Sequence, residues 1–173
     1  MKTLIAMASA IALTAATPAL AGHHGTSTIV ETAVASPQHE TLVAAVKAAD
    51  LVDTLGGEGP FTVFAPTDAA FAKLPDGTVA HLLKAENVST LRSILTYHVV
   101  PGKVSATDLI GMIEGNGGEA RLETVQGATL IASLLDGNVI LTDAKGGTAT
   151  VVKADLKASN GLVHATDSVS MPG

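Results

Sequence analysis

The sequence contains no cysteine, no tryptophan and few aromatic residues, with one tyrosine and three phenylalanines among 173 residues. Without cysteine, neither a disulfide nor a thiol nucleophile is available, so stability has to come from packing. The scarcity of aromatic rings removes the stacking platforms on which many nucleic-acid sites depend. A Gly-x-Ser-x-Gly elbow, a His-Glu-x-x-His pair and a phosphate loop are also missing, so we expect a protein that is not an enzyme.

Positive charge is scarce as well. Lysine and arginine total 10 against 16 aspartates and glutamates, which gives a formal net charge of −6. Binding to nucleic acid relies on clustered cations, whereas those of this chain are scattered singly. We therefore expect no nucleic-acid partner, and we expect the acidic excess to favour solubility.

The N-terminus has the pattern of a secretory signal. Lys2 precedes an apolar run from Leu4 to Ala16, and Ala19-Leu20-Ala21 supplies small residues for cleavage. This pattern predicts a signal peptide over residues 1–21 and a secreted or periplasmic protein. A membrane span needs about 20 apolar residues, and this run is shorter, so we expect no span.

Cleavage after Ala21 would make Gly22-His23-His24 the new N-terminus. A histidine in third place lets the terminal amine, two deprotonated amides and an imidazole surround a metal in a square plane, which copper(II) and nickel(II) prefer. We therefore predict a copper(II) site formed by Gly22, His23 and His24. The alternative is an accidental pair of histidines in a flexible start, residues 22–27. No other cofactor is indicated.

The front half of the chain has helical periodicity and the back half has strands separated by turns. Helices are expected at 29–34, 37–49 (capped by Ser36), 51–55, 68–74 (capped by Thr67), 78–84, 87–96 and 105–113 (capped by Ser105). Strands are expected at 61–65, 97–100, 120–125, 128–133, 139–142, 148–154 and 161–169. This segregation predicts an α+β fold.

The length remaining after the signal peptide suits one domain, residues 28–172, with a single core. Residues on the apolar side of each expected element should form this core: Phe64, Phe71, Leu91, Leu95, Val99 and Val163.

Three segments occur in an order that is informative. They are Gly59 to Pro75, Leu95 to Gly102 with Tyr97-His98 at its centre, and Ser159 to Asp167. Together they resemble the signature segments of the fasciclin domain family. The resemblance implies a seven-stranded β wedge or sandwich with packed helices. It also implies a monomeric extracellular module for adhesion, whose partner is a cell-surface or matrix protein or a polysaccharide.

The resemblance draws attention to Tyr97 and His98, because in animal members of the family this segment is linked to receptor binding. The apolar residues around the pair favour instead a buried, hydrogen-bonded His98. Both interpretations stay open at the level of the sequence. The family's fold also brings Asp68 near this segment, and we predict that Asp68 contacts His98.

Some secreted fasciclin domains bind carotenoids or similar molecules, so the resemblance implies a second function as a carrier of apolar ligands such as carotenoids or retinoids. Aliphatic residues after the Tyr-His segment would line the groove: Val104, Leu109, Ile110, Met112 and Ile113. Packing against the following strands also explains them, so we favour adhesion.

Overall fold

A computed structural model describes residues 27–173. Its helices are α1 (Ile29–Val34), α2 (Glu40–Ala48), α3 (Val52–Gly56), α4 (Asp68–Ala72), α5 (Thr78–Leu82), the 3₁₀ turn η1 (Ala85–Asn87), α6 (Val88–Tyr97) and α7 (Ala106–Gly115). Its strands are β1 (Phe61–Pro66), β2 (Val99–Pro101), β3 (Glu119–Glu123), β4 (Thr129–Leu135), β5 (Asn138–Thr142), β6 (Thr148–Ala158) and β7 (Gly161–Thr166). The predicted α+β class with seven strands is confirmed.

The strands form one sheet in the order β2-β1-β7-β6-β5-β4-β3. β1 and β7 run parallel, from Phe61 opposite Gly161 to Pro66 opposite Thr166. The two ends of the sheet approach each other, since the Val125 amide donates to the Val99 carbonyl at 2.8 Å. This topology places the first and last signature segments side by side at the centre of the molecule.

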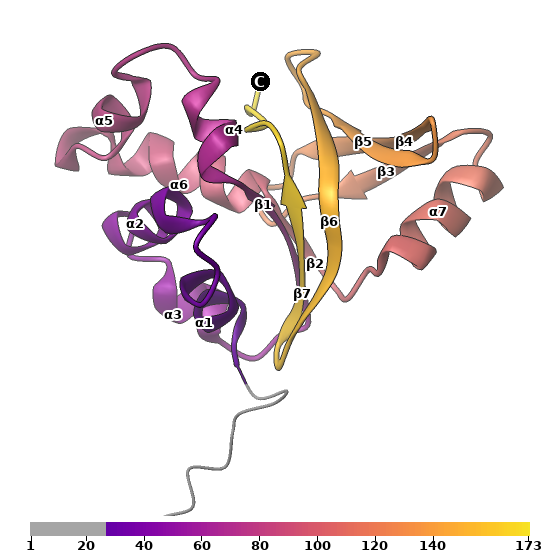
Figure 1. The fold of residues 1–173 in the computed structure, drawn as a ribbon, viewed down its shortest axis with the longest axis horizontal. Coiled ribbons are helices and arrows are strands. Elements are labelled where there is room, and N and C mark those ends of the chain that lie inside the picture. The colour runs from indigo at the N-terminus through magenta and orange to yellow at the C-terminus, as the bar shows by residue number, and fades with distance from the viewer. Residues whose placement is uncertain (1–26) are drawn as a thin grey trace, which may run out of the picture.

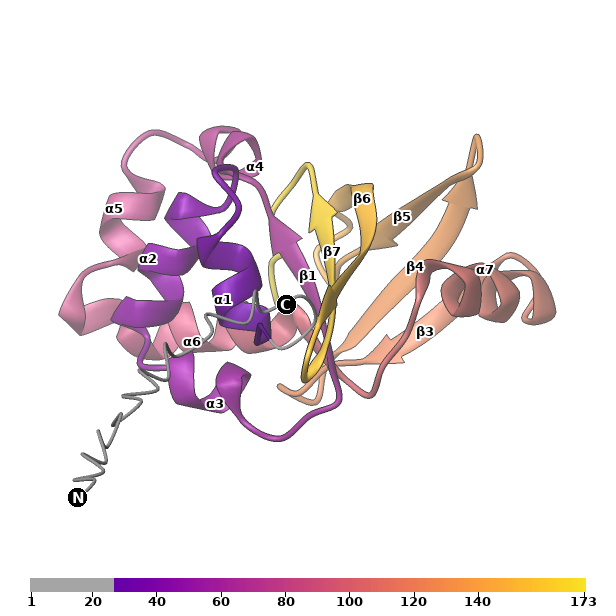
Figure 2. The same ribbon diagram turned by 60° about the horizontal axis from the view of Figure 1, so that its bottom comes forward.

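The sheet separates two apolar clusters, which corrects the expectation of a single core. Helices α1 to α6 lie on one side of β1 and β7, whereas α7 lies by β3 to β5 (Figure 1; Figure 2). Val63 and Ala65 belong to the cluster under the helices, and Phe64 belongs to the cluster under α7. Successive side chains of a strand point to opposite faces, so β1 serves both clusters. All six predicted core residues are buried.

Two helix starts follow from local sequence as predicted. The Thr67 hydroxyl accepts from the Ala70 amide at 3.3 Å at the start of α4. Ser105 and Asp108 form a reciprocal capping box at the start of α7. In each case the side-chain oxygen satisfies an amide that has no partner within the helix.

Two predicted boundaries are wrong. The second helix begins at Glu40 rather than at Pro37, with His39 in the N-cap position and no hydrogen bond from the His39 side chain to the helix. Tyr97 is the last residue of α6 rather than the first of a strand, and the strand begins at Val99. Ile94 and Tyr97 are three residues apart, so they lie on the same face of a helix, and both are buried. Burial of this face favours continuing the helix as far as Tyr97.

Within residues 27–173, no helix combines the length and the apolar character that crossing a membrane requires. The longest, α6 and α7, have 10 residues each.

Candidate functional site

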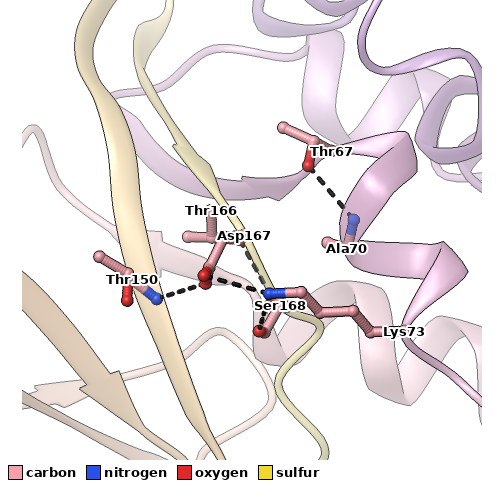
Figure 3. Close-up of polar contacts among 7 residues, drawn as sticks. All are labelled: Thr67, Ala70, Lys73, Thr150, Thr166, Asp167 and Ser168. Carbon is pink, nitrogen blue, oxygen red and sulfur yellow. Dashed lines mark hydrogen bonds and ion pairs between the residues drawn. The ribbon is translucent and has the colours of Figure 1, made fainter.

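The first and last signature segments meet where β1 and β7 end. The Thr67 amide donates to the Thr166 carbonyl at 3.1 Å. Figure 3 shows Asp167 between two elements: it accepts from the Thr150 amide of β6 at 2.7 Å and pairs with Lys73, which follows α4, at 3.1 Å. These contacts hold both ends of α4 close to the end of β7 and the start of β6.

Asp68 caps a helix that is distant in sequence. Its carboxylate accepts from the amides of Thr41 at 2.8 Å and Glu40 at 3.4 Å, which are the first amides of α2. Its own amide donates to the Gln38 carbonyl at 2.8 Å. The side chain therefore supplies the N-cap bonds that His39 does not make. The predicted contact between Asp68 and His98 is wrong, since each side chain bonds to other partners.

His98 is buried, with 3% of its surface exposed, and uses both ring nitrogens. Nε2 accepts from the Ser170 amide at 3.0 Å, so the proton must lie on Nδ1, which donates to the Ile94 carbonyl at 2.8 Å. The imidazole is thus neutral, and it joins the end of α6 to the segment that follows β7. This placement agrees with the buried, hydrogen-bonded alternative.

Tyr97 is completely buried, and its hydroxyl connects three elements. It donates to the Thr129 carbonyl of β4 at 3.2 Å and accepts from the Ala144 amide, in the turn between β5 and β6, at 3.1 Å. Burial raises the pKa of the Tyr97 phenol. A partner cannot reach this ring unless the surrounding residues move.

His164 is a second completely buried histidine with both nitrogens engaged. Its Nδ1 accepts from the Asp155 amide at 3.2 Å, so Nε2 carries the proton and donates to the Val104 carbonyl at 2.9 Å. Its ring stacks on Phe64 with a centroid separation of 5.5 Å. His164 thus packs and forms hydrogen bonds from within the last strand.

Comparison with known proteins agrees with this arrangement. The family model of the fasciclin domain matches residues 37–172. The chain belongs to the fasciclin domain family. Protein sll1483 of Synechocystis is 50% identical over 145 residues, which cover 84% of this chain and 73% of that protein. Cell surface glycolipoprotein MPB83 of Mycobacterium bovis is 34% identical over 142 residues, which cover 79% of this chain and 57% of that protein.

The fold of this fasciclin domain also resembles a solved structure, a FAS1 domain pair from the insect cell adhesion molecule fasciclin I. The TM-score is 0.74 at 19% identity, and the match covers 83% of this chain and 50% of the insect chain. At this identity the likeness shows the fold alone.

The shifted pKa values of Asp68, His39 and His98 predict that the fasciclin domain loses stability as the pH falls. Burial alone would raise the pKa of Asp68, but the amides of Thr41 and Glu40 outweigh it and hold that pKa below its ordinary value. The stability that the carboxylate contributes is therefore present above the unfolded-state pKa and is lost as the pH falls through the folded-state pKa. Burial lowers the pKa of His39 and His98, so these two histidines also favour the folded state less as the pH falls.

His39 stands out among the residues that sequence reasoning missed. It is 2% exposed, and its Nδ1 contacts the Ser36 hydroxyl at 2.8 Å. Its Nε2 is buried without a hydrogen-bond partner. The sequence pattern predicted a helix that starts at Pro37, whereas His39 occupies the N-cap position of α2.

The aliphatic residues proposed as a ligand lining divide into two groups. Leu109 and Ile113 are buried in the cluster that contains Phe64. Val104, Ile110 and Met112 are partly buried against the same cluster. Packing thus accounts for the inner two residues.

The copper ligands Gly22, His23 and His24 lie outside the described residues. Within the described range, no group of three or more histidine, cysteine, aspartate and glutamate residues is placed to hold a metal ion.

Several hollows adjoin the signature segments, among them an open one of about 510 Å³ at the starts of β1 and β7 that includes Gly59 and Gly161 in its lining. An enclosed apolar cavity beside His98 has a volume of about 20 Å³, enough for roughly one water molecule. An open groove of about 460 Å³ follows the ends of β1 and β7. Its lining consists of Pro37, Gln38, Thr67, Asp68, Ala69, Val152 and Asp167. We call this hollow the signature groove.

The placement of His98 makes a testable prediction. His98→Ala should lower the free energy of unfolding by about 1–3 kcal/mol, because the Ser170 amide and the Ile94 carbonyl lose their partner in a buried position. Asp68→Ala should cost about 1 kcal/mol through the lost cap. Since the two side chains share no hydrogen-bond partner, urea denaturation of the double variant should give additive effects. A coupling energy above about 0.5 kcal/mol between the two substitutions would instead indicate that Asp68 and His98 interact directly.

Proposed function

We propose that this fasciclin domain is a secreted or periplasmic, non-catalytic binding module. Its partner would be a component of a cell surface or matrix, either a protein or a polysaccharide. The observation that carries the proposal is the family match over residues 37–172. Two similar proteins support it: one relative is a cell surface glycolipoprotein, and the solved structure with the same fold comes from a cell adhesion molecule.

A binding role also fits the chemistry of the polar residues. The atoms that acid–base catalysis would use are engaged in structural bonds: the Asp68 carboxylate caps α2, and both nitrogens of His98 and of His164 hold backbone groups. A general base needs a free acceptor within reach of a substrate. We therefore assign these residues to the fold rather than to chemistry.

The signature groove is the surface that we assign to the partner. Both its walls come from signature segments, with Thr67 and Asp68 on one side and Asp167 on the other. Its lining also includes Val152, which is 58% exposed. An exposed aliphatic side chain among satisfied polar groups suits a surface that binds by contact.

A single charge in this groove tests the assignment. We expect Val152→Glu to weaken the binding of mature protein to washed host cells about tenfold, because contact would bury the new carboxylate. The melting temperature should stay unchanged, since Val152 is exposed. Leu135→Glu is the matched control, because Leu135 is 61% exposed on β4 and lies outside the groove lining. Equal losses in the two variants, or none in either, would contradict the assignment.

The carrier alternative rests on Val104, Ile110 and Met112, which are only partly buried. It has less support, because neither the cavity beside His98 nor the signature groove is lined by any of these three residues. Binding of retinol in the low micromolar range, lost in Ile110→Asp but not in Val152→Glu, would favour the carrier. Ile113 is unsuitable for such a test because it is completely buried.

We also propose, independently of adhesion, that the mature N-terminus binds one copper(II) ion through Gly22, His23 and His24. The chelate requires a free amine at Gly22. Titration calorimetry should therefore detect tight binding in protein that begins at Gly22 and much weaker binding when one residue precedes it. His24→Ala is the second control. Equal affinity in all three proteins, or mass spectrometry that places the mature start elsewhere, would contradict the proposal.

A further inference from the structure

The segment after β7 is held by side chains rather than by the sheet. The Ser170 amide donates to His98 Nε2 at 3.0 Å, and the Met171 amide donates to the Asp143 carboxylate at 2.9 Å. Ser170 is only 3% exposed, so the segment lies closely over His98. We call residues 168–173 the C-terminal strap; it follows Asp167, which is fixed to Thr150 and Lys73 (Figure 3).

The contact between Ser170 and His98 depends on a neutral imidazole. Nδ1 already donates to the Ile94 carbonyl, so Nε2 is the only nitrogen with a free lone pair. If Nε2 were protonated, its N–H and the Ser170 N–H would point at each other with no acceptor between them. The hydrogen bond would then become a repulsive contact, and the ring would carry a charge in a buried position.

The surroundings of His98 offer little compensation for that charge. Asp143, from the turn between β5 and β6, is the charged group within the described residues that acts on the imidazole, and the Tyr97 phenol is a titratable neighbour. Asp143 is itself engaged by the amides of Lys145, Gly147 and Met171. Burial lowers the pKa of His98, although the Ile94 carbonyl and the Asp143 charge oppose the shift.

We propose that the C-terminal strap is a pH-sensitive latch, closed on neutral His98 and released when that imidazole is protonated. Release would be local, because the strap follows the last strand and is not part of the sheet. The hydrogen bonds that Asp143 accepts from the amides of Lys145 and Gly147 do not involve the strap and would remain. Opening would uncover the His98 imidazole at the end of α6 and the Asp143 carboxylate in the turn between β5 and β6. This inference concerns conformation and does not depend on the proposed function.

Linkage sets the size of the effect. We take the pKa of His98 in the open form to be about 6.5 and assume that the closed form binds no proton. The equilibrium constant for opening of the strap is then multiplied by one plus the ratio of protonated to neutral imidazole. That factor is about 1.3 at pH 7 and roughly 30 at pH 5, so opening increases about 25-fold between them. The sign follows from the lowered pKa: closure is favoured above about 6.5 and weakens as the pH falls.

Amide hydrogen exchange of the full mature protein tests the latch. Protection factors for Ser170 and Met171 should fall about 25-fold from pH 7 to pH 5. Ala132, in β4, should keep a higher protection factor than Ser170 and Met171 at both pH values, because it exchanges by a larger opening. In His98→Gln a carbonyl that does not titrate replaces Nε2 as acceptor, and the fall should disappear. In Asp143→Asn it should persist.

Three results would overturn the proposal. They are constant protection of the strap in the native protein, an undiminished fall in His98→Gln, and equal protection factors for Ser170 and Ala132 at pH 5, which would indicate that the strap opens only by global unfolding. If His98→Gln does not fold, NMR titration of the His98 ring decides the question. Deleting residues 168–173 should move its pKa upward toward 6.5, because the ring becomes hydrated and loses the bond that favours its neutral form. An unchanged pKa after the deletion would also overturn the latch.

Discussion

Replacing Phe64 with alanine should lower the free energy of unfolding by about 3–5 kcal/mol. The side chain is completely buried at the centre of the cluster under α7, and its ring stacks on His164. Truncation would remove most of its apolar contacts and leave a cavity that the surrounding strands fill poorly. Phe71→Ala should fall near the lower end of the range, since Phe71 retains 8% exposure.

Urea denaturation followed by circular dichroism measures these changes directly. Val152→Ala is the matched control, because an exposed aliphatic truncation should change the free energy of unfolding by less than about 0.5 kcal/mol. An unchanged midpoint for Phe64→Ala would show that the cluster under α7 has been assigned incorrectly.

Gly161→Ala should destabilise the domain by at least about 3 kcal/mol. A Cβ atom at this position would overlap the backbone of Phe61 on the adjacent strand. Backbone cannot move aside as a flexible side chain can, so β1 and β7 would have to separate at the start of their parallel pairing. Gly161 does not have a positive φ, so the cost comes from this close approach and not from backbone conformation.

Gly111→Ala is the matched control for that prediction. Gly111 lies within α7, and a Cβ atom there would meet no neighbouring atom within 4 Å. Alanine is the better helix former, so this variant should gain about 0.5–1 kcal/mol. Thermal melting should therefore move in opposite directions for the two variants. A loss of stability in both would show that glycine is needed for reasons other than strand contact.

Local features of the sequence determined much of the secondary structure. The Thr67 and Ser105 caps begin helices as predicted, because an N-cap bond joins residues only three apart. Turn residues such as Asp136-Gly137 separate strands where expected, because they accept the left-handed backbone that tight turns require. The three signature segments were sufficient to predict the family, and the match over residues 37–172 confirms it.

The sequence also showed which residue types would form the site, but not their contacts. It predicted a buried His98 from its apolar neighbours, and yet it paired His98 with Asp68. Asn160 is similar: the sequence marks a turn at Asn160-Gly161, whereas the side chain donates to the Leu55 and Gly57 carbonyls and accepts from the Ile29 amide. These partners lie more than 100 residues away in sequence.

What the sequence determined by itself was the class of fold, the family, most helix and strand positions and six residues of the core. These depend on periodicity and on bonds between near neighbours. Only the tertiary structure decided that Asp68 caps α2, that β1 divides two clusters, that Gly161 lies against Phe61 and that His98 holds the C-terminal strap. Each of these joins segments brought together by chain topology, and a hydrogen bond acts only once its atoms are within about 3 Å.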